Sequence, residues 1–538
     1  MCIDREGVGM TVTSDRSSVY NARPFDVHRW SDHPEVESFV APLWHSFGAE
    51  QPIVTGSFRG RPTKRLKRDN IKVLLLDLYV CWCEDPTKYL GISSNRNHWS
   101  KGRYRAIHLS ATILDVLHWL VAKGFVDKRE HFHSANPKLS RTARYRAAES
   151  LQSMFKTALF GMDDIFNHDD RECIILKDTE VTDEETAEKA TSIDYEDTPQ
   201  TAAMRERLRA YNKLLMQSHV DIHSVQVPVI KTKISKGARR GQFNTVAIGQ
   251  HNKFVRRIFS RGSWDMHGRF YGGWWQQIGS DLRSHIFING NSTVEVDFKS
   301  MHVALLNAQL GANVIYDPYE VDADLFPKLD RQVVRGWCKS LVLTAINANN
   351  RASTYNAFRS DAPKDSPEKR LKNIQLARLL DAFIAKNPHL EESLCSDQGI
   401  NLMHRDGMIA ADIMNMLTDK GIAVLTIHDS FIVQRHHFSE LRIAMVMASL
   451  KHCRRNLIAE QDGYEVDFSD GHSLNWGVIN ERAVNKLPKY EPCEQYLHRL
   501  SRFCAVHGLV QQRSIAGRGL GAREVSVLKH SDCLTSQA

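Results

Sequence analysis

Polar and apolar positions alternate from Thr293 to Phe298, and the spacing changes to a helical one from Met301 to Leu306. This pattern predicts a half-buried strand followed by a helix. Asp297 stands near the end of the predicted strand, where a carboxylate can hold a divalent metal ion. An aspartate at such a position, taken alone, is more often a helix cap.

A second apolar run extends from Ala423 to Val433 and is interrupted by His428 and Asp429. It predicts a β-hairpin with a charged residue in the middle. Burying the Asp429 carboxylate would be costly unless a cation were bound beside it. The two stretches together indicate a candidate metal site made of Asp297 and Asp429.

Helical patterns dominate residues 56–170, which follow an irregular segment, 1–55. One helix is predicted over 110–124, where a serine precedes the apolar run and a glycine ends it. A short strand, a polar tip and a returning strand with Arg144 and Arg146 come next. This order resembles a winged helix, which binds duplex DNA in plasmid and phage replication initiators. A helical domain with a basic face is the alternative.

Two further basic stretches are candidate nucleic-acid contacts. Residues 59–62 read Arg-Gly-Arg-Pro and resemble the core of an AT-hook, in which Arg61 would lie in the minor groove. Lys236 and Arg239 belong to a second basic stretch near aromatic residues, which suits a nucleic-acid backbone track. Solvated basic loops are the alternative interpretation of both stretches.

The composition limits these interpretations. The 538 residues suffice for about two to four domains, and contents of 42% hydrophobic and 25% charged residues describe a globular protein. A net charge of +8 favours a polyanionic partner only modestly. The 10 cysteines form no CxxC pair, so we expect reduced thiols in a cytoplasmic protein. No apolar run is long enough to cross a membrane.

Four motifs between residues 260 and 435 occur in a recognisable order. They are Gly268-Arg269, the strand that ends at Asp297, a helix with Arg335 and Lys339, and the sequence His-Asp-Ser-Phe that starts at His428. This order resembles that of the single-subunit nucleic-acid polymerases, which join family A DNA polymerases to phage and mitochondrial RNA polymerases. The resemblance covers less than half of the chain.

The resemblance implies an α+β fold with a right-hand palm and fingers behind the mostly helical N-terminal domain. The palm would comprise residues 263–310 and 404–480, with the fingers at 311–403 between them. Independently of the resemblance, an acidic segment poor in apolar residues predicts a linker and a domain boundary at 171–200. A helical, thumb-like region, 201–262, would follow the linker and precede the palm. A C-terminal tail, 481–538, with a short helix would follow it.

The resemblance also implies roles for the site residues. Asp297 and Asp429 would bind two Mg²⁺ ions, for which Mn²⁺ can substitute. Arg335 and Lys339 share one helical face and would grip a nucleoside triphosphate, and Lys339 would also assist the departure of pyrophosphate. The macromolecular partners would be a DNA template and a primer or nascent strand. No membrane partner is expected.

Other positions bear on the strand and the sugar. Arg269 and His428 would contact the nucleic acid near the growing end. His302 stands where RNA polymerases of this group have a glycine and DNA-synthesising relatives have a bulky side chain, which favours deoxynucleotides. Asn347 replaces a tyrosine that helps to position the sugar and the template base, and it would lie in the nucleotide site.

We therefore predict a DNA-directed DNA polymerase that acts in the replication of a phage or mobile element. Two alternatives remain open. The His-Asp-Ser-Phe sequence favours a compact phage-type RNA polymerase or a primase-like enzyme. The third hypothesis, from another functional class, is a non-catalytic replication initiator that binds DNA.

Overall fold

The computed structural model describes residues 22–50, 64–99, 102–104, 108–132, 142–179, 190–233, 243–314, 316–322, 325–363, 365–457, 459–461, 464–466 and 491–507. Within these ranges the chain mixes helices and strands, so the α+β class predicted from the sequence is confirmed. The chain divides into two compact units, Met1–Arg171 and Glu172–Ala538. Each unit has a hydrophobic core of its own.

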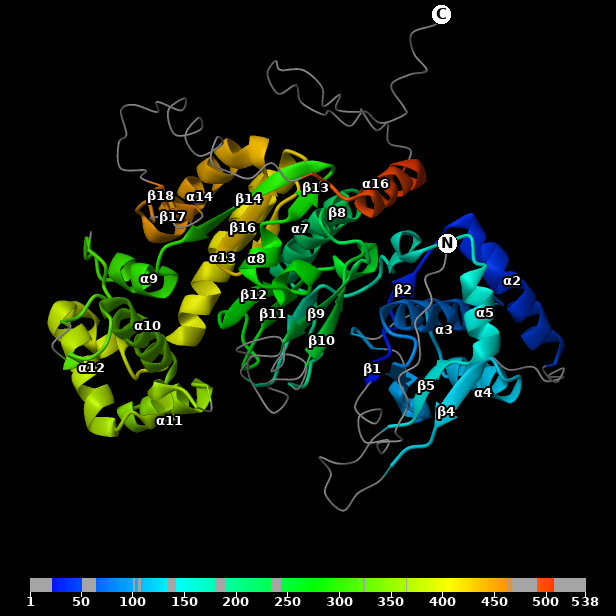
Figure 1. The fold of residues 1–538 in the computed structure, drawn as a ribbon, viewed down its shortest axis with the longest axis horizontal. Coiled ribbons are helices and arrows are strands. Elements are labelled where there is room, and N and C mark those ends of the chain that lie inside the picture. The colour runs from blue at the N-terminus through cyan, green and yellow to red at the C-terminus, as the bar shows by residue number, and fades with distance from the viewer. Residues whose placement is uncertain are drawn as a thin grey trace, which may run out of the picture. The chain divides into compact units, whose positions relative to one another are not determined.

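In its described residues, the first unit packs four α-helices with a small sheet (Figure 1). The helices are α2 (Pro34–Ala49), α3 (Lys64–Glu84), α4 (Thr112–Ala122) and α5 (Glu149–Lys156). The sheet has the order β1 (Ala22–Pro24), β3 (Tyr89–Gly91), β5 (Arg144–Ala147) and β4 (Val126–Arg129). A further pair is formed by β2 (Arg29–Trp30) and β6 (Phe166–Asn167).

The predicted order of helix, glycine and two antiparallel strands is present in this unit. The backbone N–H of Thr112 donates to the Ser110 hydroxyl at 3.4 Å where α4 begins. Gly124 has a φ of +71° just after α4, a conformation that favours glycine. Strands β4 and β5 then pair antiparallel.

The prediction of an irregular segment over residues 1–55 is wrong for part of its length. Helix α2 lies within it and buries an apolar stripe at helical spacing in the core of the first unit, made of Val36, Val40, Leu43 and Phe47. The side chain of His33 accepts from the backbone N–H of Glu35 and caps this helix. Residues 1–21 and 51–63 lie outside the described residues.

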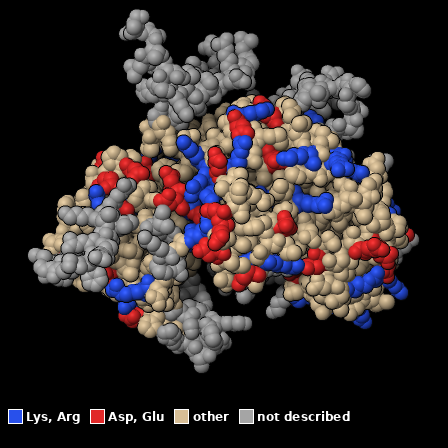
Figure 2. Space-filling model, turned by 180° about the vertical axis from the view of Figure 1, so that it is seen from behind, with Lys and Arg blue, Asp and Glu red and all other residues tan. Residues whose placement is uncertain are grey.

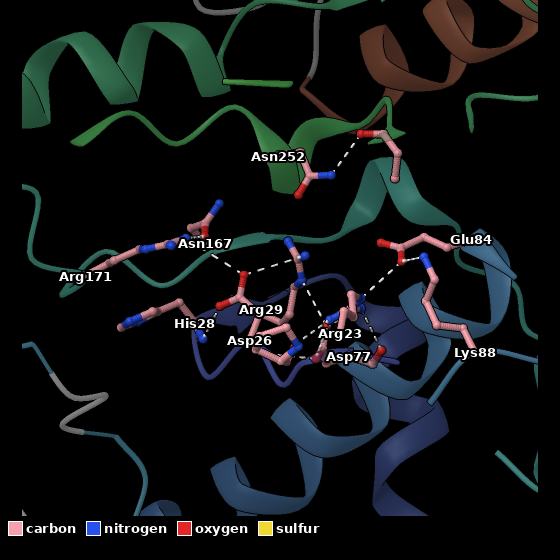
Figure 3. A network of polar contacts seen from close by, with 12 residues as sticks. Arg23, Asp26, His28, Arg29, Asp77, Glu84, Lys88, Asn167, Arg171 and Asn252 are labelled. Carbon is pink, nitrogen blue, oxygen red and sulfur yellow. Dashed lines mark hydrogen bonds and ion pairs between the residues drawn. The ribbon is translucent and has the colours of Figure 1, made fainter. Parts of the chain in front are cut away.

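A polar network attaches the first strands of the chain to α3 (Figure 3). The buried Asp77 carboxylate of α3 accepts hydrogen bonds from Arg23 Nη2 at 2.8 Å and from Arg29 Nε at 3.2 Å. It also accepts from the backbone N–H of Asp26 at 2.8 Å. Because a buried carboxylate is costly unless it is paired, these contacts explain how Asp77 can interrupt an apolar helix.

The second unit is built on an antiparallel sheet (Figure 1). Its strand order is β15 (Leu425–Ile427), β16 (Ser430–Gln434), β14 (Asn291–Phe298), β13 (Ile286–Ile288) and β8 (Val220–Ile222). Strand β14 also pairs with β17 (Ala459–Gln461), which pairs with β18 (Tyr464–Val466). The predicted strand at 293–298 and the predicted hairpin at 423–433 are both confirmed.

Long helices surround this sheet. Helix α14 (Phe438–Cys453) packs on β16, and α13 (Gly399–Asp419) packs against α14, α7 (Pro199–Met216) and α9 (Met301–Gln309). Three further helices, α10 (Arg331–Asn347), α11 (Arg351–Asp361) and α12 (Asn373–Lys386), form a group between α9 and α13 in the chain. Apolar residues of this group, such as Leu341 and Phe383, belong to the same core as the sheet.

Helix α13 makes an unusually close contact with a second, smaller sheet. That sheet has the order β12 (His267–Tyr271), β11 (Arg256–Phe259) and β7 (Ile174–Leu176). A Cβ atom added to Gly407 of α13 would lie 2.4 Å from the carbonyl oxygen of Gly268 in β12. Position 407 therefore requires glycine, because no side chain fits between the two backbones.

Two predictions about the region before the main sheet are wrong. The expected linker over 171–200 contains β7, which pairs with β11. Ile174, the first residue of β7, and Cys173 before it are completely buried. The reason is the apolar run from Cys173 to Leu176, which is long enough for a buried strand. In the expected helical region 201–262, α7 is the only α-helix among the described residues, and strands β8 to β11 follow it.

Strands β9 (Val229–Lys233) and β10 (Phe243–Ala247) form a hairpin in that region. The residues between them, 234–242, lie outside the described residues.

The C-terminal helix expected within 481–538 is present as α16 (Glu494–Val506), and it is docked on the sheet. Arg499 Nε donates to Asp221 Oδ2 of β8 at 2.6 Å. Tyr496 and Leu500 pack against Phe287 of β13. This segment is thus part of the second unit's structure, although the sequence predicted a tail. Residues 467–490 and 508–538 lie outside the described residues.

Candidate active site

The pairing of three strands brings the two predicted metal carboxylates to one end of the sheet. Asp297, near the end of β14, is the register partner of Ser430, the first residue of β16. The backbone N–H of Phe298 donates to the carbonyl oxygen of Asp429 at 3.2 Å. His428 and Asp429 form the two-residue loop between β15 and β16, and His428 has a φ of +59°.

Asp429 lies in an environment that disfavours its charged form. Burial raises the pKa of the Asp429 carboxyl group, and the negative charge of Asp406 raises it further, whereas the positive charge of Arg269 lowers it. The net result is a raised pKa. A bound cation would stabilise the ionised carboxylate at this place.

The donor set suits magnesium. Mg²⁺ is usually held by one or two carboxylates together with waters and substrate phosphates, rather than by a complete cage of protein ligands. The exposed Asp297 and the partly buried Asp429 supply such a pair. Within the described residues, no group of three or more His, Cys, Asp or Glu side chains is arranged to hold a metal ion. Asp297 and Asp429 are carboxylate donors of the kind that Mg²⁺ takes when waters and substrate oxygens complete its coordination.

Ser430 and Glu295 support the loop that carries Asp429. The Ser430 hydroxyl donates to Glu295 Oε1 at 2.6 Å. Arg283 Nη2 donates to the same oxygen at 2.8 Å. Glu295 stands two residues before Asp297 on β14, so the two carboxylates share one face of the strand. The sequence analysis did not single out Glu295.

Arg269, Asp406 and His302 form a cluster of three polar residues within electrostatic range of Asp429. Arg269 Nε of β12 donates to Asp406 Oδ1 at 2.9 Å and to Oδ2 at 3.0 Å, and Arg269 Nη2 also donates to Oδ2. Arg269 Nη2 lies 2.9 Å from His302 Nε2 of α9. Burial raises the pKa of Asp406, but Arg269 and His302 outweigh that effect and lower it to about 2.

Asp406 was missed by the sequence analysis, although a signal was present. It lies on the buried stripe of α13 between Leu402 and Ile409, where every other position is apolar or glycine. A charged residue on such a stripe indicates a buried partner of opposite charge. Arg269, 137 positions away in the chain, is that partner.

His428 packs in an aromatic environment at the same loop. Its ring meets the Tyr271 ring edge-to-face, with 5.3 Å between the centroids. The Tyr271 hydroxyl donates to His267 Nε2 at 3.1 Å. Burial, assisted by the charge of Arg269, lowers the pKa of His428 to about 4. His428 is therefore neutral at neutral pH, and any nucleic-acid contact would use hydrogen bonding or stacking rather than its charge.

Helix α10 carries the two predicted triphosphate residues. The Asp330 side chain accepts from the backbone N–H of Gln332 at 2.7 Å and caps the helix. Arg335 Nε donates to Asp317 Oδ2 at 2.5 Å, whereas Lys339, one turn on, is exposed. Burial raises the pKa of Asp317, but Arg335 and further donors outweigh it, so the net shift is downward.

The Arg335–Asp317 pair is within electrostatic range of Lys299, the residue that follows the end of β14. The positive charge of Lys299, two residues after Asp297, also lowers the pKa of Asp317. This interaction connects α10 electrostatically to the carboxylate end of the sheet.

Asn347 makes structural contacts at the end of α10. Its Nδ2 atom donates to the carbonyl oxygen of Leu343 at 2.7 Å. A Cβ atom added to Gly399, the first residue of α13, would lie 1.7 Å from Asn347 Oδ1. Asn347 thus fixes the junction of α10 and α13, and the described contacts give it no nucleotide-facing role.

The structure describes only two of the remaining predicted nucleic-acid contacts, Arg144 and Arg146. Arg144 is only 8% exposed, although it shares a face of β5 with Arg146, so the structure does not support a phosphate contact at this position. Arg146 is partly exposed; its Nε donates to Asp127 Oδ2 at 3.0 Å, and its guanidinium lies 4.9 Å from the centre of the Tyr89 ring. Arg61, Lys236 and Arg239 lie outside the described residues.

Charged side chains of both signs occur on the face seen in Figure 2. There, Lys and Arg side chains lie among Asp and Glu side chains. In the part of the chain that is described, no helix is sufficiently long and apolar to span a membrane.

Comparison with protein-family models and with curated protein sequences gave no match for this chain. The functional interpretation therefore depends on the residues and their geometry.

Proposed function

We propose that the chain is a template-directed nucleic-acid polymerase, and that it synthesises DNA. The observation that carries this proposal is the register of β14 against β16, which sets Asp297 beside the loop that carries Asp429. Two adjacent carboxylates of this kind are what nucleotidyl transfer with two divalent metal ions requires.

The proposal gives each described residue a definite task. Asp297 and Asp429 would hold the Mg²⁺ ions, which supply stabilisation of the attacking and leaving oxygens when bound. The exposed ammonium of Lys339 would neutralise the triphosphate of the incoming nucleotide. Arg335 would act beside Lys339. In the structure, Arg335 also donates to the Asp317 carboxylate, which partly neutralises its charge.

The central sheet with α13 and α14 would then form the palm, and α10, α11 and α12 would form the fingers. Support for this assignment comes from the chain order, in which the helical group lies between the strand with Asp297 and the hairpin with Asp429. The first unit would bind duplex DNA through the β4–β5 hairpin, where Arg129 and Arg146 both lie over the Tyr89 ring.

The choice between deoxynucleotides and ribonucleotides rests on His302. Its ring is held near the carboxylate end of the sheet, and a bulky side chain there would clash with a 2′-hydroxyl group. The second candidate function is RNA synthesis, which the His-Asp-Ser-Phe sequence at the loop favours.

Primer extension tests the proposal. The full-length protein should extend a primed DNA template in the presence of Mg²⁺ and dNTPs. If the protein extended the primer only with rNTPs and not with dNTPs, its function would be RNA synthesis. Failure to extend with either set, over a range of primers and with unprimed duplex, would favour the non-catalytic initiator.

A further inference from the structure

Helix α14 is apolar on its exposed side as well as on the side that packs in the core. Its inner face is buried through residues such as Leu441 and Met445. Four of its residues are exposed, and three of these are large and apolar: Ile443, Met447 and Leu450, with exposed fractions of 48%, 55% and 44%. A helix that is apolar all round is normally covered on every side.

The three exposed apolar side chains lie in one line along the helix. They are separated by four and by three positions, so they share one helical face. On α10, α12 and α16 such residues occur singly, as Val333, Ile374 and Leu497. Single exposed apolar residues are normal on a protein surface, whereas an apolar patch with a polar rim indicates an interaction site.

This line continues into one charged residue at each end. Glu440 stands three positions before Ile443, and Arg454 stands four positions after Leu450. Glu440 is partly exposed and Arg454 is exposed. Together with Met447 these residues repeat at alternating spacings of three and four, which is the pattern of a seam between two packed helices. We call the five residues the α14 seam.

The order of the two charges favours one orientation of a second copy of the chain. In a parallel pair of α14 helices, each Glu440 would meet the Glu440 of the other copy, and like charges repel. In an antiparallel pair centred on Met447, Glu440 of each copy meets Arg454 of the other, because both stand seven positions from the centre. The seam is therefore complementary to itself about a two-fold axis, as a closed dimer requires.

We propose that the α14 seam is the interface of a homodimer, in which two α14 helices pack antiparallel across a two-fold axis at Met447. The seam is about 21 Å long. One helix pair of this length buries less than the roughly 1,600 Å² of a standard interface, so the dissociation constant should be about 10–100 µM. The inference does not depend on the proposed polymerase function.

Sedimentation velocity of the full-length chain, from about 1 µM to about 200 µM, tests the proposal. The wild type should change from monomer to dimer over this range. Met447→Lys sets two like charges against each other at the axis, so the dissociation constant should rise at least about tenfold. The matched control is Ile374→Lys, the same kind of change at a residue of α12 that is 61% exposed, and it should dimerise as the wild type does.

Exchange of the two charges tests the antiparallel arrangement. Glu440→Arg and Arg454→Glu each set like charges opposite one another, so each should raise the dissociation constant by about three- to tenfold. The double variant restores opposite charges at both ends and should return the constant to the wild-type value. Thermal unfolding of dilute samples checks that every variant is folded, and these two positions serve if Met447→Lys is not.

Three outcomes would overturn the proposal. A wild type that stays monomeric up to about 200 µM would show that another segment of the chain or a different protein covers the seam. A dimer that persists in folded Met447→Lys would place the interface elsewhere. Two charge variants that the double variant does not rescue would exclude the antiparallel pair.

Discussion

At the scale of single residues, Asp429 combines partial burial with a neighbouring carboxylate, Asp406, and Arg269 offsets this only in part. Asp429→Asn removes one charge of the proposed metal pair but keeps the shape of the loop. Several kcal/mol of transition-state stabilisation should be lost, so extension should slow by roughly 10²–10³-fold. Single-turnover primer extension measures this rate, and binding of primed DNA should stay within about threefold.

The control for this variant is Asp419→Asn, at the exposed end of α13, where the carboxylate pairs with Arg207. It should extend primers at the wild-type rate. Extension by Asp429→Asn at a comparable rate would exclude Asp429 as a metal ligand.

Lys339 gives a second prediction at this scale. Because Asp317 holds the Arg335 guanidinium, Lys339 is the more accessible cation on this face of α10. Lys339→Ala should lower kcat/KM for the nucleotide by about 10–100-fold, through loss of a charge-assisted contact with the triphosphate. The neighbouring exposed residue offers a control, Ser340→Ala, which should leave kcat/KM unchanged. Equal kinetics for both variants would remove Lys339 from the nucleotide site.

Residue-scale prediction from the sequence succeeds where a local pattern carries the information. The positions of Asp297 near the end of a strand and of Asp429 in a hairpin loop could be predicted, because an alternating pattern marks the strand and an apolar run marks the hairpin. Asp406 could not be assigned a role, since its partners Arg269 and His302 come from other elements of the fold. The burial of Arg144 could not be predicted, because Arg144 and Arg146 have the same place in the strand pattern and differ only in which neighbouring residues cover them.

At the scale of elements, helix α16 is held by groups that respond to acid. His219 is buried between Tyr496 and Phe503, and Lys253 and Arg499 add positive charge nearby. Burial, followed by these two charges, lowers the pKa of His219 to about 3. A histidine whose pKa is depressed on folding stabilises the protein above its unfolded pKa of about 6.5 and progressively less as the pH falls towards 3.

His219→Met should therefore reduce the loss of stability in acid. At pH 7 the thermal midpoint should stay near the wild-type value, since methionine has a similar volume and no charge to bury. At pH 5 and below, the variant should be the more stable of the two, as measured by thermal unfolding over a pH series. His498→Ala, at an exposed position of α16, should follow the wild-type curve. If the thermal midpoints of His219→Met and of the wild type fell in parallel as the pH is lowered, His219 would not be the group that destabilises the protein in acid.

The element scale also shows where sequence patterns fail. Strand β7 was hidden in an acidic segment because its three residues pair with β11, about 80 positions later in the chain, and such distant pairing leaves no local signal. The packing of α16 on the sheet could not be predicted from the sequence either, because it depends on contacts with Asp221 and Phe287 from two separate strands. Long elements such as α13 and the β15–β16 hairpin were predictable from their own periodicity.

At the scale of the whole molecule, the division after Arg171 separates two cores. Residues 172–538 alone should retain primer extension, because the carboxylate pair, the Arg269 cluster and α10 all belong to that unit. Residues 1–171 alone should fold and bind duplex DNA, if the hairpin of β4 and β5 serves as a wing. Extension assays and fluorescence anisotropy on the two fragments measure these activities.

The variant Arg146→Ala, made in the N-terminal fragment, tests whether this unit binds duplex DNA through the β4–β5 hairpin. Its partly exposed guanidinium is available at the hairpin, so duplex affinity should fall and the salt dependence should weaken. Loss of primer extension in the 172–538 fragment would instead show that synthesis needs both units. The acidic composition of 171–200 indicated a domain boundary in that segment, and the division after Arg171 lies at its start. The segment is not a linker throughout, because it contains β7.

The contact of Gly407 with Gly268 affects how natural or laboratory variation in this chain should be interpreted. In a random-mutation library screened for activity, glycine should persist at both positions, while Asn401 and Asp419 on the same helix, both exposed, should vary freely. Alanine at 407 would push α13 away from β12 and draw Asp406 from Arg269 without changing any charged residue. A substitution usually scored as mild would thus inactivate the chain, and a compensating second mutation would have to restore space between two backbones.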